Sequence, residues 1–592
     1  MTTASPGGLP PQATPASIDA GAARPLSTRL LEWADRWRAW LLAALVIVYA
    51  VSITGRWRVA PDSALSMSLG RSLAEGQGFT YHGKPHDWVE PGLPYVVAAS
   101  FKLFGVENYP PLTFFTLACG VVSLALIYGI VKLYAGRPTA VLITLLLAVC
   151  ETFYRYCFQI VTDMPFLVGL FAVLLGYERL VGSPPPTGPN GDDVAGTAAS
   201  STAPRPAAAW WAWCLLMAGT LVMCVFRPTI ITFVGALFVA TAWHVLRGPN
   251  RLRHALIGTV VVASVVAFRA TDPRRKTVGE SVHREATLRS LLTERRGFAM
   301  QRMFTKFIPE MVSELTPEAV LGVELGKGLD ETFSVVVIGL GVALFTRRPL
   351  WGAWVAATVA QMAFWMPRER YFLPILPLLL LALWYAALWL ERRLRPQVGA
   401  AAFAGVMLLV FVPNLLQIGV FVREQRWRGI TATDRRDPTI SYLVEMGKVI
   451  ADHVTPADVV VADSPRELTY FSRRTVVEPP RARRVPPTER ELELAQQELL
   501  AAPRLFVVLS DSEKRASDSK KREPDSEKHE YVRSLIDELG MQPGPAIATV
   551  VRPPDRGKTY PPLTLHQLVP KQTSGPGGPP PPSTRPAPAG AS

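Results

Sequence analysis

Apolar segments of membrane-spanning length recur along most of the chain, with short polar breaks between them. The first covers Trp40–Ile53, and ten more follow near residues 112–134, 139–153, 163–180, 209–226, 229–246, 254–269, 332–346, 350–366, 371–390 and 398–421. A helix that crosses a bilayer needs roughly 20 mainly apolar residues, and several of these segments are slightly shorter. The pattern therefore predicts about eleven spans, whose boundaries are approximate by a few residues.

Arginine in the short loops predicts which side of the membrane each loop occupies. Basic residues precede the first span and recur in alternate loops: Arg29, Arg36, Arg38, Arg137, Arg247, Arg251, Arg253, Arg347, Arg348, Arg392, Arg393 and Arg395. Cytoplasmic loops carry an excess of Lys and Arg. We therefore expect the N-terminus and the Pro-rich linker 183–206 in the cytoplasm, and an odd number of spans places the C-terminal region outside.

Composition agrees with a multi-pass protein of the cell (plasma or inner) membrane. The 592 residues are 49% hydrophobic, and the mean hydropathy is +0.20. The net charge of +14 is attributed to the cytoplasmic arginines and not to nucleic-acid binding. The five cysteines lie in or beside apolar segments with no CxxC pair, which favours buried apolar residues over a zinc site.

The polar regions divide the chain into domains. We expect a disordered cytoplasmic tail over 1–38, a transmembrane domain over 39–421 with outer loops 56–111 and 270–331, an extracytoplasmic α/β domain over 440–570, and a disordered tail over 571–592. In the α/β domain, strands are predicted at Asp458–Ala462, Thr475–Glu478, Leu505–Leu509 and Ala546–Val551, and helices at Ile440–His453, Glu489–Ala501 and Glu530–Leu539. The expected fold class is mainly α: a polytopic helical bundle with interfacial helices and this small C-terminal domain.

The first outer stretch, Arg56–Gly105, is too polar to span a bilayer but is clearly patterned. Pro61-Asp62-Ser63 predicts a helix start with Asp62 as N-cap. The apolar residues then recur every fourth position, at Leu65, Leu69 and Leu73. Such a helix, tethered to a span, is expected to lie in the membrane interface with its apolar stripe toward lipid. That arrangement places the Asp62 carboxylate at the outer surface.

Other polar residues converge on the same outer depth. A second acid, Asp163, opens the fourth span, and the outer turns carry Arg227 and the run Arg368-Glu369-Arg370-Tyr371. Glu90, Tyr154 and Tyr156 also fall on this side. The orientation therefore predicts a site at the outer mouth of the bundle.

The order and sidedness of five stretches resemble the GT-C glycosyltransferases, multi-pass enzymes that use polyprenyl-phosphate sugars. These stretches are PDSALSMSLGRSLAEGQGFTY, EPGLPYVVAASFKLFG, TDMPF, FRP and RERYFLPILP, and the resemblance covers about residues 40–420. The nearest types are the protein O-mannosyltransferases, the lipid A aminoarabinose transferases and the rhizobial galacturonosyltransferases. The resemblance implies that Asp62, in the first outer loop, is the catalytic or acceptor-positioning carboxylate, and it matches Asp163 to a second acid.

The sequence departs from these relatives at two positions. Many of them carry a paired acid in the first loop, whereas Asp62 is followed by Ser63. The aminoarabinose transferases have a Lys before the Pro that corresponds to Pro91, and this chain has Glu90 there. The second departure argues against an aminoarabinose substrate.

The chemistry of such a transfer agrees with the residues available. A lipid phosphate leaves without protonation, so the reaction needs one general base for the acceptor hydroxyl and cations for the phosphate. We assign Asp62 and Asp163 as catalytic candidates, with a single inverting displacement. Arg227, Arg370 and Tyr371 are candidates for the donor phosphate, together with basic residues of the 270–331 loop. Glu90, Tyr154 and Tyr156 are candidates for the acceptor or sugar side. The acceptor is a lipid, glycan or protein; membrane lipids are further partners, and no cofactor or metal is indicated.

Each residue also has a structural interpretation. Asp62 and Asp163 can act as helix N-caps, and Arg227 and Arg370 as interfacial charges whose stems lie in lipid. His82, His86 and Asp87 suit a solvated loop better than a metal site, since no further ligand follows at a recognisable spacing.

The sequence also leaves one different class of function open. A transporter, or a scaffold for export or cell-envelope glycan assembly, is the alternative. A transporter would carry ionisable residues near the bilayer midplane and show inverted repeats, and the sequence shows neither.

Overall fold

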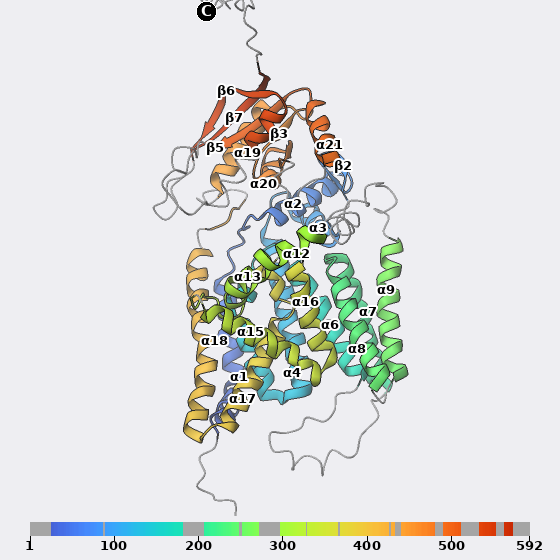
Figure 1. Cartoon of the computed structure of the whole chain (residues 1–592), viewed down its shortest axis with the longest axis vertical. Coiled ribbons are helices and arrows are strands. Elements are labelled where there is room, and N and C mark those ends of the chain that lie inside the picture. The colour runs from blue at the N-terminus through green and yellow to red at the C-terminus, as the bar shows by residue number, and fades with distance from the viewer. Residues whose placement is uncertain are drawn as a thin grey trace, which may run out of the picture.

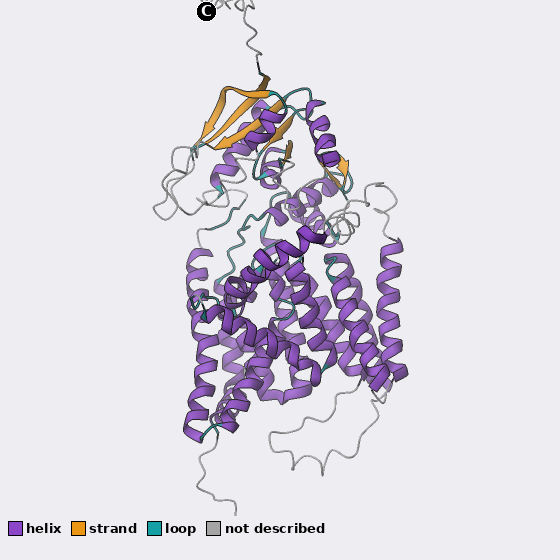
Figure 2. Ribbon diagram, in the orientation of Figure 1, coloured by secondary structure: helices purple, strands orange, loops and turns teal. Residues whose placement is uncertain are grey.

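The structure is a computed structural model, and it describes residues 25–86, 89–181, 206–247, 251–271, 296–326, 328–364, 367–425, 428–431, 440–479, 489–510, 532–551 and 562–571. A bundle of long helices forms the body, and a small α/β domain lies at one end of it (Figure 1, Figure 2). The predicted fold class, a polytopic helical bundle with a small C-terminal α/β domain, is confirmed. The predicted linker 183–206 and the predicted tail 571–592 lie outside the described residues, except for Pro206 and Lys571.

The bundle is built from helices at the predicted positions. They are α1 (Leu26–Val51), α4 (Pro110–Val149), α6 (Asp163–Val181), α7 (Pro206–Phe226), α8 (Ile230–Arg247), α9 (Arg251–Thr271), α15 (Leu329–Ala343), α16 (Pro349–Phe364), α17 (Leu376–Arg393) and α18 (Pro396–Gln425). Among the described residues, six of these helices, α4, α6, α8, α9, α15 and α18, are long and apolar enough to cross a membrane.

One helix of the bundle holds two of the predicted spans. Within α4, Gly136 has φ 78° and ψ 172°, so the helix is broken there. The break falls between the predicted spans 112–134 and 139–153. A φ of this sign is favourable only for glycine, and Pro138 follows, so residues 136–138 separate two helices. The helix positions are therefore consistent with about eleven segments.

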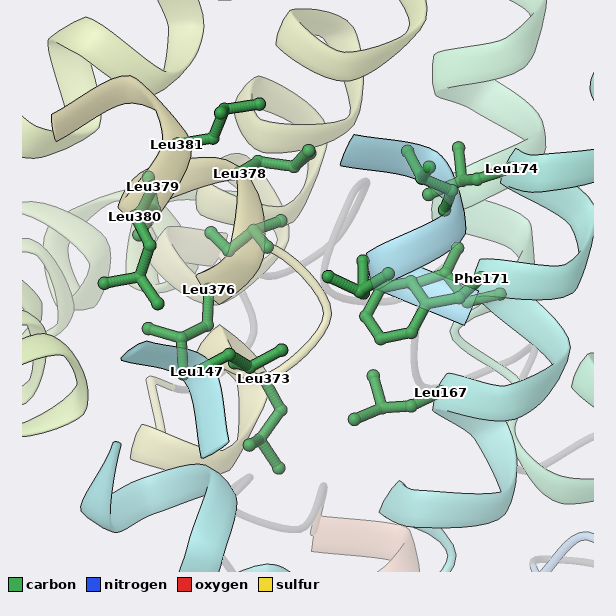
Figure 3. Packing of buried hydrophobic residues seen from close by; sticks show 14 of the residues in the cluster. Leu147, Leu167, Phe171, Leu174, Leu373, Leu376, Leu378, Leu379, Leu380 and Leu381 are labelled. Atoms are coloured by element: carbon green, nitrogen blue, oxygen red, sulfur yellow. The ribbon is translucent and has the colours of Figure 1, made fainter. Parts of the chain in front are cut away.

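The centre of the bundle is packed with leucine and aromatic side chains from α4, α6 and α17. Figure 3 shows Leu147 of α4 and Leu167, Phe171 and Leu174 of α6 near the run of leucines Leu376, Leu378, Leu379, Leu380 and Leu381 of α17. All of these residues except Leu378, which is 4% exposed, are at most 1% exposed. Close packing of this kind holds the outer ends of the helices in fixed positions, and those ends carry the polar site.

The outer layer consists of short helices between the spans. These are α2 (Pro61–Ala74), α3 (Gly92–Phe104), α5 (Glu151–Cys157), α12 (Arg296–Arg302), α13 (Ile308–Glu310) and α14 (Thr316–Leu321), with the hairpin β1 (Thr80–Tyr81) and β2 (Lys84–Pro85). Figure 1 shows α2 and α3 between the bundle and the α/β domain.

The C-terminal domain has a five-stranded mixed sheet. Its strands are β3 (Val459–Val461), β4 (Thr475–Val477), β5 (Leu505–Ser510), β6 (Met541–Val550) and β7 (Leu563–Pro570), in the order β4-β3-β5-β7-β6. β4, β3 and β5 are parallel, and β7 and β6 are antiparallel to their neighbours. The helices are α19 (Ser441–His453), α20 (Pro465–Ser472), α21 (Glu489–Leu500) and a short helix over 532–538. The sequence prediction missed β7 and α20.

Three further expectations about the outer layer and the N-terminus were wrong. The disordered tail was placed over 1–38, but α1 begins at Leu26. The N-cap of α2 is Ala60 and not Asp62, because Pro61 occupies the first helical position. The stripe on α2 does not face lipid, since Leu65 and Leu69 are buried, where α2 packs against α3 and α20.

Candidate active site

Asp62 lies in the first turn of α2, where the local sequence leaves its carboxylate available. Ser63 Oγ accepts hydrogen bonds from the Ala60 N–H (3.0 Å) and from Trp57 Nε1 (3.1 Å). These contacts fix the helix start without using Asp62. The Asp62 carboxylate instead accepts a hydrogen bond from Arg370 Nη2 at 2.5 Å and another from Arg466 Nη1 at 2.5 Å.

The two guanidinium groups set the charge state of Asp62. Burial acts to raise the pKa of this carboxyl, but the attraction and hydrogen bonds of Arg370 and Arg466 outweigh burial and lower the pKa to about 2. Asp62 is therefore fully ionised at neutral pH. Its side chain is still 47% exposed, so the carboxylate is open to approach from solvent.

The second acid, Asp163, is sealed inside the bundle with Arg227. Their closest atoms, Asp163 Oδ1 and Arg227 Nη1, are 2.8 Å apart, and the exposed fractions of the side chains are 1% and 8%. The distance is that of an ion pair, although the orientation does not satisfy hydrogen-bond geometry. The Arg227 guanidinium also lies 5.2 Å from the ring centre of Tyr371 and 5.9 Å from that of Phe166.

A small cavity adjoins this buried pair. It is lined by Phe166, Arg227, Thr229, Trp354, Thr358, Gln361, Met362, Tyr371 and Pro374. Most of the lining is apolar, and Arg227 is its one charged residue among the described side chains. Its volume of about 10 Å³ has room for no more than one water molecule.

Arg370 connects the two acids. It belongs to the short 3₁₀ turn Glu369–Phe372 that precedes α17. Burial acts to lower the pKa of Arg370, but the negative charges of Asp163 and Asp62 raise it above its ordinary value. One guanidinium therefore stands within electrostatic reach of both carboxylates, as the sequence predicted for this face.

A further acidic group lies beside Arg370. Glu369 pairs with Arg155 of α5 and accepts a hydrogen bond from the Tyr156 hydroxyl at 3.2 Å. Glu318 of α14 is adjacent, and burial together with a hydrogen bond to Glu369 raises the pKa of Glu318 to about 7. The sequence prediction included Tyr156 but missed Glu369 and Glu318, although Glu369 adjoins Arg370 in the chain.

Two predicted acceptor-side residues lie elsewhere. The Tyr154 hydroxyl contacts Ser52 and donates to the Val48 carbonyl of α1 at 3.2 Å, so Tyr154 packs α5 against α1. Glu90 pairs with Arg269 at the end of α9, at 3.0 Å. In the interactions that the structure describes, neither residue contacts the cluster of Asp62, Arg370 and Arg466, which we call the Asp62 cluster.

The basic loop over 270–331 is only partly described. Arg274, Arg275, Lys276 and Arg295 lie outside the described residues, and the Arg302 guanidinium lies 5.3 Å from the ring centre of Phe307. Within the described part of the chain, no group of three or more His, Cys, Asp or Glu residues has the geometry to hold a metal ion.

Comparison with known protein families finds a match over one segment of the chain. The family model described as dolichyl-phosphate-mannose-protein mannosyltransferase matches residues 84–184. The resemblance to the GT-C glycosyltransferases is confirmed over this segment. The segment includes Glu90, Tyr154, Tyr156 and Asp163, but Asp62, Arg227 and Arg370 lie outside it. A search of curated protein sequences finds no match.

Solved structures of other proteins are also similar to this chain. One is ArnT from Cupriavidus metallidurans bound to undecaprenyl phosphate, with 13% identity, a TM-score of 0.49, and coverage of 90% of this chain and 98% of that chain. Another is the archaeal oligosaccharyltransferase AglB from Archaeoglobus fulgidus, in complex with an inhibitory peptide and a dolichol-phosphate. It has 13% identity, a TM-score of 0.43, and coverage of 81% of this chain and 70% of that chain. At these TM-scores neither likeness carries an inference about function.

Proposed function

We propose that this chain is an integral membrane glycosyltransferase that moves a sugar from a polyprenyl-phosphate carrier to a hydroxyl group of a lipid, glycan or protein. The observation that carries the proposal is the outer cluster in which Arg370 lies between Asp62 and Asp163. It offers a carboxylate for the hydroxyl proton and arginines for the phosphate in one place. The family match over residues 84–184 supports the same class of reaction.

The proposed reaction is a single displacement. The acceptor oxygen forms a bond to the anomeric carbon, while the bond from that carbon to the phosphate oxygen breaks. The phosphate keeps the electron pair, and the hydroxyl proton passes to a carboxylate oxygen of Asp62. Attack opposite the leaving group inverts the anomeric centre, and a phosphate leaves without an acid to protonate it.

The arginines have a separate role in this scheme. A guanidinium binds phosphate oxygens through two parallel hydrogen bonds, and its charge persists at all physiological pH values. In this scheme Arg370 and Arg227 stabilise the negative charge that the departing phosphate gains. Tyr371 lies near both guanidiniums, at 5.4 Å and 5.2 Å from its ring centre, and holds them in place.

The deciding experiment tests donors directly. The full-length chain in membranes is incubated with a panel of polyprenyl-phosphate sugars and envelope extract, and the products are analysed by mass spectrometry. We expect one added sugar residue with one donor, and no product from membranes that carry the Asp62→Asn variant. Transfer from none of the donors by correctly inserted protein would reject the proposal.

The same proposal requires a defined orientation in the cell membrane. The N-terminus is cytoplasmic and the α/β domain extracytoplasmic, with the Asp62 cluster on the outer side. A reporter that is active only outside the membrane, fused after Lys571, should be active. Activity of the reporter inserted at Pro185 instead would reverse the orientation.

A further inference from the structure

The C-terminal domain is anchored on α2 by a buried aromatic contact. Tyr470 of α20 is 1% exposed, and its hydroxyl lies 3.0 Å from that of Tyr109. Arg71 of α2 donates to the Tyr470 carbonyl at 2.9 Å, and its guanidinium lies 4.0 Å from the ring centre of Tyr470. These contacts fix α20 against α2.

This anchoring places the first turn of α20 over the first turn of α2. Arg466 lies one turn before Tyr470 and reaches Asp62 across 404 residues of sequence. The exposed fraction of its side chain is 38%. A cation from the α/β domain therefore stands at the open side of the Asp62 carboxylate, within reach of a ligand.

The resting arrangement is poorly suited to proton transfer. Two guanidiniums contact the Asp62 carboxylate, and Arg370 is also under the influence of the Asp163 charge. A general base works best when its pKa is near the working pH, and Arg370 and Arg466 hold the pKa of Asp62 far below that. The remaining N–H donors of the two guanidiniums can take an anion, since each guanidinium has five.

We propose that Arg466 is a phosphate-binding residue of the donor site, and that the donor phosphate draws Arg466 and Arg370 away from Asp62. The carboxylate then regains basicity only when the donor is present. This inference rests on the proposed function, but it concerns phosphate binding and needs no transfer to be tested.

The other charged groups near this cluster do not replace Arg466. In the described structure, Arg370 contributes from the 3₁₀ turn, with Asp163 behind it. Tyr81 of β1 and Glu467 of α20 are nearby. The charges of Arg466 and Glu467 both act on the Tyr81 hydroxyl. Arg466 is thus the cation that the α/β domain places on the carboxylate itself.

The test measures binding of a sugar-free polyprenyl monophosphate to the full-length chain in phosphatidylcholine nanodiscs, by native mass spectrometry. Arg466→Gln should weaken binding about ten- to a hundredfold, the usual effect of losing a charge-assisted contact. The matched control is Arg473→Gln. Arg473 directly follows α20 and pairs with Glu75, which directly follows α2, at 3.5 Å, so the control removes an ion pair between the far ends of the same two helices.

A second variant tests the exchange of partners. Asp62→Asn removes the anion that competes for the two arginines, so it should bind the lipid phosphate several-fold more tightly than the original chain. Equal binding by Arg466→Gln and Arg473→Gln, or unchanged or weaker binding by Asp62→Asn, would overturn the inference. Displacement of the lipid by inorganic phosphate alone at millimolar concentration would assign the site to a free ion and would also overturn it.

The outcomes separate this inference from the proposed function. The expected binding pattern without any sugar transfer would retain the phosphate site and reject the glycosyltransferase. Sugar transfer by the original chain, together with undiminished lipid-phosphate binding by Arg466→Gln, would retain the glycosyltransferase and reject the phosphate-binding role of Arg466.

Discussion

Two aspartate–arginine contacts occur on the same side of the bundle, and they differ mainly in exposure. The exposed fraction of the Asp62 side chain is 47%, whereas that of Asp163 is 1%. Asp62 meets two arginines from distant parts of the chain, and Asp163 meets Arg227 beside an apolar cavity. Breaking a buried pair leaves an uncompensated charge without water, whereas an exposed carboxylate can exchange partners at little cost to the fold. We infer from this difference that Asp163 acts mainly on stability, whereas the exposed carboxylate of Asp62 is available for chemistry.

The largest expected effect comes from removing the exposed carboxylate. Asp62→Asn keeps the size of the side chain, and Ser63 still fixes the start of α2. Sugar transfer should fall about a hundred- to ten-thousandfold through loss of the general base, while thermal unfolding stays unchanged. Near-normal turnover by correctly inserted Asp62→Asn would move the base to Asp163 or another acid.

Removing the buried carboxylate should act on stability first. Asp163→Ala leaves Arg227 charged and unpaired, which costs roughly 3–5 kcal/mol. Unfolding of the purified protein in detergent, followed by heat or denaturant, should show this loss. The double variant Asp163→Asn with Arg227→Gln removes both charges and should recover part of the stability. If Asp163→Ala is as stable as the original chain, Asp163 does not stabilise the fold and, like Asp62, is available for chemistry.

The arginine shared by the two acids should show an intermediate effect on donor use. Arg370→Ala removes a charge-assisted contact to the phosphate, which corresponds to about ten- to a hundredfold in kcat/KM for the donor. The measurement varies the donor concentration at saturating acceptor. If Arg370→Ala, Arg227→Ala and the double variant all keep the original dependence on donor, neither residue binds the phosphate.

The smallest effect is a shift of pH dependence. Arg466 helps to lower the pKa of Asp62 to about 2 from an ordinary value of 3.8, so Arg466→Gln should raise that pKa. The acid-side fall of kcat/KM, which reports the free enzyme, should then occur at higher pH than in the original chain. Arg473→Gln should not change the pH at which kcat/KM falls. If kcat/KM falls at the same acidic pH in both variants, Arg466 does not act on Asp62.

Sequence reasoning was most reliable for features that depend on local pattern. Apolar length predicted the helices of the bundle, including the two that Gly136 separates, because lipid-facing and core-facing positions are both apolar. The positions of the polar residues between spans predicted Asp62, Asp163 and Arg370 at one depth, and Arg370 lies within electrostatic reach of both acids. The N-cap assignment failed although a signal was present: Pro61 favours the first helical position, which makes the preceding Ala60 the cap.

The remainder depends on contacts between distant segments. Arg466 lies on α20, a helix of 8 residues, which is too short to give a clear period of apolar positions. Its partner Asp62 lies in a different domain, and no local pattern links the two. The stripe on α2 was assigned to lipid for the same reason, since sequence does not reveal that a domain some four hundred residues later covers that helix.

The backbone of the first outer loop also pairs with the chain that follows the last span. Trp57 and Ile430 exchange two hydrogen bonds of 2.8 and 2.9 Å, and Gly429, with φ 90°, would place any side chain 2.9 Å from the Trp57 carbonyl. A ribosome that adds 5–20 residues per second reaches Ile430 roughly 20–75 s after Trp57. Throughout that interval the segment around Trp57 is without its backbone partner. Folding of this region therefore waits for a contact between segments 373 residues apart, and a chain truncated before residue 430 would leave the face of α2 that α20 covers without its partner.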